Sequence, residues 1–345
     1  MIDLFSDTKT RPTAQMRAAM MEAEVGDEQM GEDPSVNALC ERVADMLGKE
    51  SAVFLPSGCM ANELAIKVLC RPGDDVVCER SSHIVHYEAG APAALSGVTL
   101  MTIDGDRGRY SVEQARAVMR KASFASPGTR MICCEQTTNI GGGALWELDD
   151  LRALTELAHA HAAFAHLDGA RLMNAVVAQD VAPSEFAYGF DSAWIDFSKG
   201  LGAPVGSVLA GSRDFIDEAW FYKKQWGGAM RQAGILAAAC SFALDHHVDR
   251  LADDHANARR LAEGLAELPG LLIDPSLVDT NLVFFELAEG DANAFAAALQ
   301  SHGVRVSVVG PRRLRAVTHL DISVDDIDAA VAAFEQVIFS TSDSE

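Results

Sequence analysis

The stretch Ser198-Lys199-Gly200-Leu201-Gly202-Ala203-Pro204-Val205-Gly206 follows an apolar run at 192–197, and Asp168-Gly169-Ala170-Arg171 follows an earlier apolar run at 163–167. A lysine among glycines at the end of a buried strand, paired with an upstream aspartate, is an arrangement that holds pyridoxal phosphate. The amine forms a Schiff base, and the carboxylate keeps the pyridine nitrogen protonated so that the ring accepts electrons. An isolated pair of this kind is more often a solvated lysine and a turn-capping aspartate, so the assignment depends on the surrounding sequence.

Apolar runs that alternate with helical periodicity indicate the fold of the N-terminal part of the chain. Helical segments at 60–69 and 151–161 separate the expected strands, which lie at 52–55, 131–134, 163–167, 192–197 and 205–210. This alternation is typical of an α/β domain with a largely parallel sheet. Because loops at the carboxyl ends of parallel strands converge, we expect Asp168 and Lys199 to meet in one cleft.

The pattern changes near residue 245. A long charged helix at 249–268 is followed by short strands and helices that predict a compact α+β unit. We therefore expect a large domain over residues 1–245, including the N-terminal arm, and a small C-terminal domain over residues 246–345. Residues 341–345 are expected to form a frayed polar tail.

Two glycine-containing turns are candidates for binding phosphate. Ser57-Gly58-Cys59 begins a helix and offers backbone N–H groups to an anion, although an ordinary turn capped by Ser57 is an equal alternative. Gly200 and Gly202 resemble the opening of a dinucleotide fingerprint. The residues after Gly202 predict a strand, whereas that fingerprint must open a helix, so we disfavour a dinucleotide.

The composition indicates a folded, acidic protein. Of the 345 residues, 49% are hydrophobic and 23% are charged, and the net charge of −22 would repel nucleic acids and anionic membranes. No apolar segment is long enough to span a bilayer, and the chain begins without a leader pattern, so we expect a cytoplasmic protein with no membrane partner. The seven cysteines lack Cys-x-x-Cys spacing, which favours reduced thiols, and no metal site is expected.

Motifs from one end of the chain to the other suggest a family. The N-terminal half carries DLFSDT (3–8), VGD (25–27), GEDP (31–34), PSGCMAN (56–62), and His83 followed by EAG (88–90). Further along the chain come DGARL (168–172), SKGLG (198–202), GGAMRQ (227–232) and VTHLD (317–321). Together they resemble the low-specificity L-threonine aldolases, pyridoxal-phosphate enzymes of the aspartate aminotransferase-like fold, called fold type I.

The resemblance implies a carbon–carbon lyase. Such an enzyme cleaves an L-β-hydroxy-α-amino acid, for example threonine, allo-threonine or a phenylserine-like compound, to glycine and an aldehyde. It implies a large α/β domain with a mostly parallel sheet, a smaller C-terminal α+β domain, and a homotetramer with active sites between subunits.

The resemblance also implies a role for each site residue. Lys199 would carry the cofactor, Asp168 would pair with the pyridine nitrogen, and His83 would stack on the ring. His83 and His86, one helical turn apart, are alternative bases. The implied phosphate ligands are Ser57, Gly58, Cys59 and, from a neighbouring subunit, Lys224 and Arg231. The implied substrate ligands are Ser6, Arg171 and Arg315, and Arg171 also counts among the residues near the cofactor. Met30 and His86 are further candidates for the substrate site.

Several positions that are expected to determine substrate preference depart from the common family pattern. Phe5 replaces an arginine, Met30 replaces a tyrosine, and Glu-Gln-Thr-Thr-Asn at 135–139 replaces Glu-Asn-Thr-His-Asn. The loop 125–129 lacks the usual histidine. Together with Phe124, these changes favour an apolar pocket and a substrate bulkier than threonine, such as phenylserine.

Two other classes of function stay open at this point. The same cofactor site would serve a β-eliminating lyase or dehydratase, an aminotransferase or a racemase, because the bond that is broken depends on an orientation that the sequence does not fix. A cofactor-bound sensor without turnover is disfavoured, because Lys199, Asp168, Arg171 and Arg315 form a full catalytic set.

Overall fold

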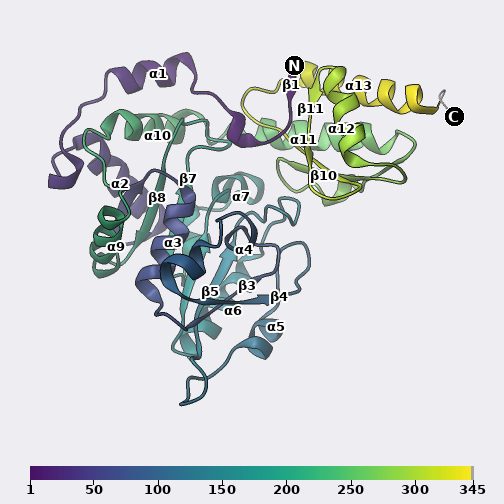
Figure 1. The fold of residues 1–345 in the computed structure, drawn as a ribbon. Helices are drawn as coiled ribbons and strands as arrows, with labels where there is room; N and C mark the ends of the chain where they lie inside the picture. The colour runs from purple at the N-terminus through teal and green to yellow at the C-terminus, as the bar shows by residue number, and fades with distance from the viewer. Residues whose placement is uncertain (343–345) are drawn as a thin grey trace.

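The larger part of the chain is built on a seven-stranded sheet in the computed structural model, which describes residues 1–342 (Figure 1). The order is β2-β8-β7-β6-β5-β3-β4; β3 to β7 are parallel, and β8 runs antiparallel to both of its neighbours. The expected α/β class with a largely parallel sheet is confirmed. The strands are β2 (Ser51–Leu55), β3 (Asp75–Glu79), β4 (Thr99–Ile103), β5 (Thr129–Glu135), β6 (Phe164–Asp168), β7 (Ser192–Asp196) and β8 (Ser207–Gly211).

Two of these strands were not among those expected from the sequence. β3 has three apolar residues between Asp75 and Glu79, a run too short to stand out, although all five of its residues are buried. β4 lies at the edge of the sheet and is mostly half-buried. The five expected strands correspond to β2, β5, β6, β7 and β8.

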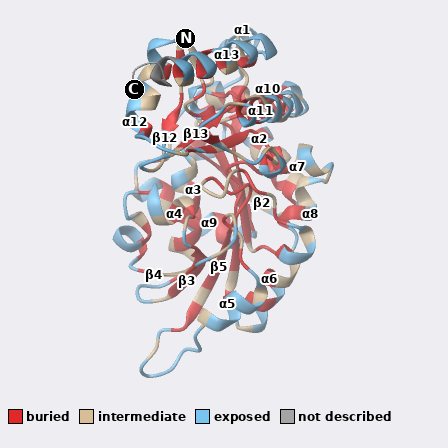
Figure 2. Ribbon diagram, turned by 90° about the vertical axis from the view of Figure 1, so that its right-hand side faces the viewer, coloured by how far each residue is buried: buried red, intermediate tan, exposed pale blue. Residues whose placement is uncertain are grey.

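Helices cover both sides of this sheet, whose central strands are buried (Figure 2). The N-terminal arm contributes helix α1 (Ala14–Met21), which packs against α10 (Gly234–His246). The helices of this region are α1 (Ala14–Met21), α2 (Pro34–Leu47), α3 (Gly58–Leu69), α4 (His83–His86), α5 (Val112–Val118), α6 (Leu148–Ala160), α7 (Leu172–Gln179), α8 (Pro183–Ala187), α9 (Arg213–Gln225) and α10 (Gly234–His246).

The C-terminal part is an α+β unit with its own core. Its antiparallel sheet has the order β12-β13-β10-β9 and packs against α11 (Leu251–Ala266) and α13 (Val324–Ser342). Helix α13 includes the first two residues of the expected frayed tail, and residues 343–345 lie outside the described residues. The remaining elements are β9 (Leu271–Leu272), β10 (Leu282–Leu287), α12 (Ala292–Ser301), β11 (Val304–Arg305), β12 (Ser307–Val308) and β13 (Arg313–Val317).

The N-terminal arm joins the two parts. Strand β1 (Ile2–Asp3) pairs with β11, and Leu4 is buried in the core of the C-terminal unit. The arm then passes to the larger part through a 3-10 turn at Asp7–Lys9. The boundary at residue 245 stays a prediction, but the arm belongs to both parts by its contacts.

The described helices offer no membrane-spanning segment. Within residues 1–342, none is both long enough and apolar enough to cross a bilayer.

Candidate active site

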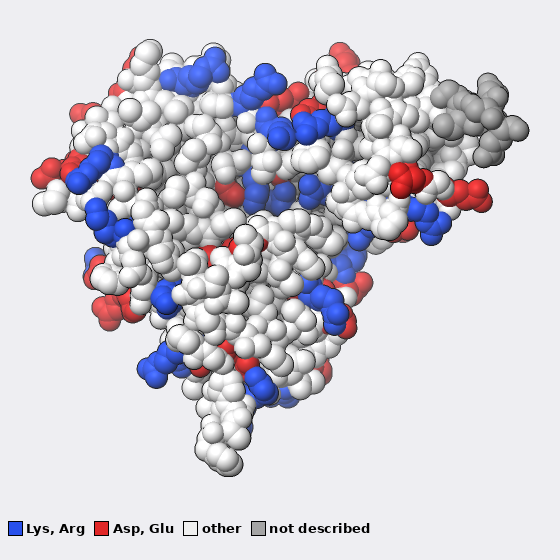
Figure 3. Space-filling model, viewed as in Figure 1, with Lys and Arg blue, Asp and Glu red and all other residues white. Residues whose placement is uncertain are grey.

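Lys199 and Asp168 lie at the carboxyl ends of neighbouring parallel strands. Asp168 is the last residue of β6. Lys199 comes three residues after Asp196, the last residue of β7. The hydroxyl of Thr10 donates to the carbonyl of Lys199 at 2.8 Å, so the N-terminal arm closes over this turn. Basic and acidic side chains gather where the two parts of the molecule meet (Figure 3).

A buried hydrogen-bond network fixes the carboxylate of Asp168. The Asn62 amide donates to Asp168 Oδ2 at 2.8 Å, and the backbone N–H of Ala170 donates to Oδ1 at 3.0 Å. The orientation of Asn62 is fixed in turn, because its Oδ1 accepts from Trp194 Nε1 and lies 3.0 Å from His166 Nε2. Burial lowers the pKa of His166 to about 4, so this imidazole is neutral. Asp168 is thus held rigidly as an acceptor.

Helix α4 presents His83 to the same region. Its Nδ1 is 2.8 Å from Glu88 Oε1, and its backbone N–H donates to Glu135 Oε2 at 3.0 Å. Since a carboxylate only accepts, Nδ1 carries the proton and Nε2 is left as the basic nitrogen. His86 is exposed and its ring lies 3.0 Å from the carbonyl of Arg80. Of the two candidate bases, the contacts favour His83.

The pKa of His83 reflects three opposing influences. Burial lowers the pKa, while the hydrogen bond to Glu88 and the nearby carboxylate of Asp168 raise it. The two raising influences outweigh burial, so the pKa lies above 6.5. The carboxyl group of Glu63 lies beside that of Glu88. Burial and the neighbouring Glu88 raise the pKa of Glu63 to about 9.

This arrangement predicts the pH dependence of two isosteric variants. In Glu88→Gln the imidazole loses its charged partner, its pKa falls, and the acid limb of kcat/KM should move to lower pH by about one unit. Glu63→Gln replaces a neutral acid with a neutral amide and should leave the acid limb in place. The pH profile of each variant against the wild type tests this, and an acid limb that stays fixed in Glu88→Gln would contradict it.

The turn before α3 has the geometry of an anion site. Ser57 is the N-cap, and its Oγ accepts from Met60 N at 3.3 Å, while the N–H groups of Gly58 and Cys59 lie in the first turn, where a helix offers no acceptor. Gly58 also has a packing role, because a Cβ there would lie 2.3 Å from the ring of Trp194. Burial raises the pKa of Cys59 to about 11, so the thiol is neutral.

Arg171 and Arg315 differ in the partners that their guanidinium groups contact. Arg171 is buried and forms a bidentate pair with Asp7 at 2.7 and 2.8 Å, which leaves one terminal nitrogen outside the pair. Arg315 donates to Asn139 Oδ1 at 2.8 Å and to the carbonyl of Phe5 at 3.4 Å, and its buried Nε has no hydrogen-bond partner among the described residues. Ser6 Oγ accepts from the Thr8 backbone at 3.2 Å. Arg315 and Arg171 therefore each keep one guanidinium nitrogen outside these hydrogen bonds.

Lys224, Arg231 and Met30 lie together, away from the hydrogen bonds of the Lys199 region. Lys224 donates to Gln29 Oε1 at 2.6 Å, Arg231 donates to Asp27 Oδ2 at 2.6 Å, and Met30 is largely exposed. Neither cation is hydrogen-bonded to the Ser57 turn of its own chain. Their assignment to a neighbouring subunit stays a prediction.

The aromatic residues expected in an apolar substrate pocket are dispersed in the single chain. The Phe5 ring lies under Lys9 and Arg305, with cation-to-centroid distances of 5.5 and 4.4 Å. Phe124 is fully exposed on the loop between α5 and β5, which projects from the larger part (Figure 1). The apolar pocket stays a prediction.

A possible ligand set for a metal ion occurs near His83. Among the described residues, Cys59, His83 and Glu88 place ligand-type atoms within 4.8 Å of one another. The imidazole and the carboxylate are already hydrogen-bonded to each other, and the thiol is protonated. We assign no metal to this group, and the expectation of a metal-free site stays a prediction.

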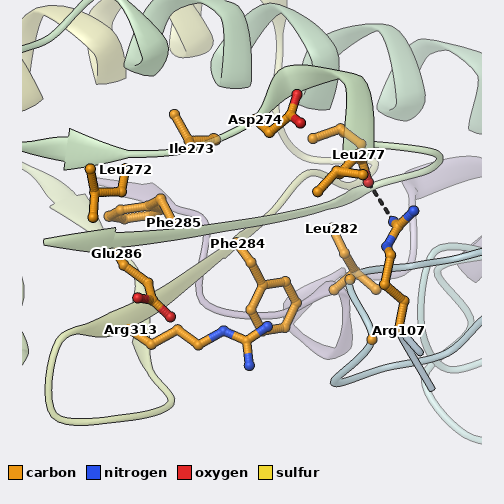
Figure 4. Close-up of a pocket in the computed structure, with 13 residues that line it drawn as sticks. Arg107, Leu272, Ile273, Asp274, Leu277, Leu282, Phe284, Phe285, Glu286 and Arg313 are labelled. Carbon is orange, nitrogen blue, oxygen red and sulfur yellow. Dashed lines mark hydrogen bonds between the residues drawn. The ribbon is translucent and has the colours of Figure 1, made fainter. Parts of the chain in front are cut away.

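A separate cavity of about 250 Å³ lies between β10 and the Arg107 loop (Figure 4). Its two arginines are engaged: Arg107 pairs with Asp279 at 2.9 Å, and Arg313 lies over the Phe284 ring at 4.6 Å. The cavity does not include Lys199, and nothing in its lining indicates chemistry.

Several residues that build the site were not singled out from the sequence. Asn62 and Glu88 lie within motifs that match the family. For Asn62 the sequence offered one further signal, a polar residue among the apolar positions of α3. Glu135 lies opposite Asp168 in the sheet register, and burial raises its pKa to about 7. Asp7 also lies within a matched motif, but its partner Arg171 is set by the fold, and Asp196 lies outside the matched motifs.

The chain is similar in sequence and in fold to proteins that are already known. Residues 3–289 match the model of the beta-eliminating lyase family. The chain is 38% identical to low-specificity L-threonine aldolase 1 of Arabidopsis thaliana, covering 98% of this chain and 97% of that protein. It is 39% identical to the low specificity L-threonine aldolase of Escherichia coli K12, covering 96% and 98%. A solved Leishmania major threonine aldolase has the same fold, with a TM-score of 0.85, 20% identity, and coverage of 98% and 100%.

Proposed function

Because the chain belongs to the low-specificity L-threonine aldolases, within the beta-eliminating lyase family, we propose that it cleaves L-β-hydroxy-α-amino acids to glycine and an aldehyde. The observation that carries the proposal is the pair formed by Lys199 and the rigidly held Asp168 at the ends of adjacent strands. The fold is that of fold type I pyridoxal-phosphate enzymes.

The residues present fit pyridoxal phosphate as the cofactor. Lys199 offers an amine, Asp168 offers a fixed carboxylate, and the open N–H groups of Gly58 and Cys59 offer donors suited to a phosphate. When bound, the cofactor supplies an electron sink for the pair released from the broken Cα–Cβ bond. The negative charge of Asp168 favours the protonated ring nitrogen on which that sink depends.

The side chains of the site supply binding and proton transfer. Arg315, with its unpaired Nε, would hold the substrate carboxylate, with Ser6 and the remaining nitrogen of Arg171 beside it. His83, with Nδ1 bound to Glu88, would accept the β-hydroxyl proton at Nε2 as the aldehyde leaves. Glu88 stabilises the imidazolium that results.

The proposal includes an assembly with active sites shared between subunits, as the family resemblance implies. In support, the contacts of Lys224 and Arg231 in the single chain lead to Asp27 and Gln29, and the neighbouring Met30 is exposed. A homotetramer would let these residues complete the phosphate and substrate sites of another chain. A cytoplasmic location stays a prediction from the sequence.

A product analysis tests the function. The purified protein with pyridoxal phosphate should release glycine and the matching aldehyde from threonine, allo-threonine and phenylserine in equal amounts. The substitutions at positions 5 and 30 predict a kcat/KM ratio above one for phenylserine over threonine. Keto acid with ammonia and without glycine would instead support elimination, and keto acid without ammonia or glycine would support transamination. A ratio well below one would reject only the substrate preference.

A further inference from the structure

The ion pair of Lys199 is made with Asp196, a residue to which the family resemblance assigned no role. Asp196 Oδ2 lies 3.0 Å from Lys199 Nζ. The side chain of Asp196 is 5% exposed and that of Lys199 is 15% exposed, so water screens the pair weakly. A carboxylate at this distance favours the positively charged form of the nitrogen.

Asp196 is held in place without help from the lysine. Its other oxygen, Oδ1, accepts from the backbone N–H and from the hydroxyl of Ser198, both at 2.8 Å. As the last residue of β7 it is also paired in register with Ser207 of β8. The sheet and the Ser198 turn therefore direct Oδ2 toward the lysine whether or not Nζ is charged.

The other charged and titratable groups near Lys199 are either paired with another residue or neutral. The indole of Trp194 lies 5.9 Å from Nζ and adds a weak attraction for a cation. Four ionisable groups come from other elements: Asp7, which is paired with Arg171; Asp168, held by Asn62; His83, bound to Glu88; and Cys59, whose thiol is neutral.

We propose that Asp196 is a positioning residue for Lys199, one that keeps the lysine nitrogen protonated and directed into the site. The inference rests on the proposed function, in which this nitrogen carries the cofactor. When the substrate ammonium group takes its place there, it would pass two protons to Lys199. The resulting ammonium group of Lys199 would stay beside Asp196 and donate one proton to the α-carbon of glycine, which supplies the electron pair. Lys199 is then a neutral amine, able to displace the product.

A spectroscopic titration of the wild type and of Asp196→Asn tests the assignment. Asparagine keeps the shape and the acceptor for Ser198 but removes the charge. The visible band of the bound pyridoxal phosphate reports the protonation of the nitrogen that links it to Lys199. Its midpoint should fall by about one to three pH units in the variant, and Asp196→Glu, which keeps the charge, should restore most of the shift.

Two controls separate the possible outcomes. Asp328→Asn removes a carboxylate paired with Arg260 on the surface and should leave the midpoint unchanged. A midpoint in Asp196→Asn equal to that of the wild type would overturn the role of Asp196, and Asp196→Ser serves the same comparison if asparagine is not tolerated. A wild type that binds no pyridoxal phosphate at Lys199 would overturn the proposed function, and this inference with it.

Discussion

Lys199→Ala is expected to lower kcat for aldol cleavage by about 10³-fold or more, because one change removes both the covalent attachment of the cofactor and a proton donor. Acid–base catalysis alone contributes about 10² to 10⁴-fold, and the loss of a nucleophile adds to that. The position of the residue supports both roles, because the amine is largely buried and lies just beyond a strand end, beside Asp196.

The measurement combines kinetics with chemical mapping. Borohydride reduction of the wild type should fix pyridoxal phosphate on the peptide that contains Lys199, and Lys199→Ala should lack the adduct. Lys67→Ala is the matched control, since Lys67 is outside the site and donates to the carbonyl of Leu95. A Lys199→Ala variant with wild-type turnover, or an adduct on another lysine, would refute the assignment of the site.

The sequence was sufficient for the parts of the site that depend on local order. The strand that ends at Asp168 and the strand before Lys199 are runs of buried residues, and parallel strands deliver their carboxyl ends to one edge of a sheet. The position of both residues follows from these two facts. The Ser57 turn was predictable for the same reason, because it joins a short buried strand to a helix.

The supporting contacts could not be predicted, because they join elements far apart in the chain. Asn62 and Asp168 meet only when α3 packs across β6 and β7. The buried contact of Glu63 with Glu88 is unfavourable unless one of them holds a proton, and a sequence pattern carries no information about that. Asp196 is three residues before Lys199, yet its orientation follows from Ser198 and β8.

The pairing of Arg171 with Asp7 could also not be predicted from the sequence. The family resemblance implies that it grips the substrate carboxylate, and the structure places it in a buried bidentate pair with Asp7. A guanidinium with two of its donors committed acts first as a structural cation. Its contribution to binding depends on the nitrogen left outside the pair and on Arg315 beside it, whose Nε is buried and unpaired.

Asp7→Ala is expected to lower the free energy of unfolding by about 3–5 kcal/mol, because it leaves Arg171 buried without its counter-ion. Burial raises the pKa of Asp7, but the charge of Arg171 outweighs burial and holds the pKa well below 3.8. The pair therefore contributes fully above pH 4, and its contribution is lost as the pH falls below that value. Asn281 of the C-terminal unit also donates to Asp7, at 3.2 Å, so the loss should reach both parts of the molecule.

Denaturant unfolding of the variants at neutral pH checks this expectation against two comparisons. Asp104→Ala breaks an exposed pair with Arg80 and should cost less than about 1 kcal/mol. The double variant Asp7→Leu with Arg171→Met removes both charges and should regain most of the stability, while kcat/KM stays low because the substrate loses a cation. If Asp7→Ala were no less stable than Asp104→Ala, the buried pair would not hold the arm on the larger part. In the double variant, the free energy of unfolding should recover while kcat/KM does not. The remaining loss of kcat/KM measures what Arg171 contributes to substrate binding, separately from what it contributes to the fold.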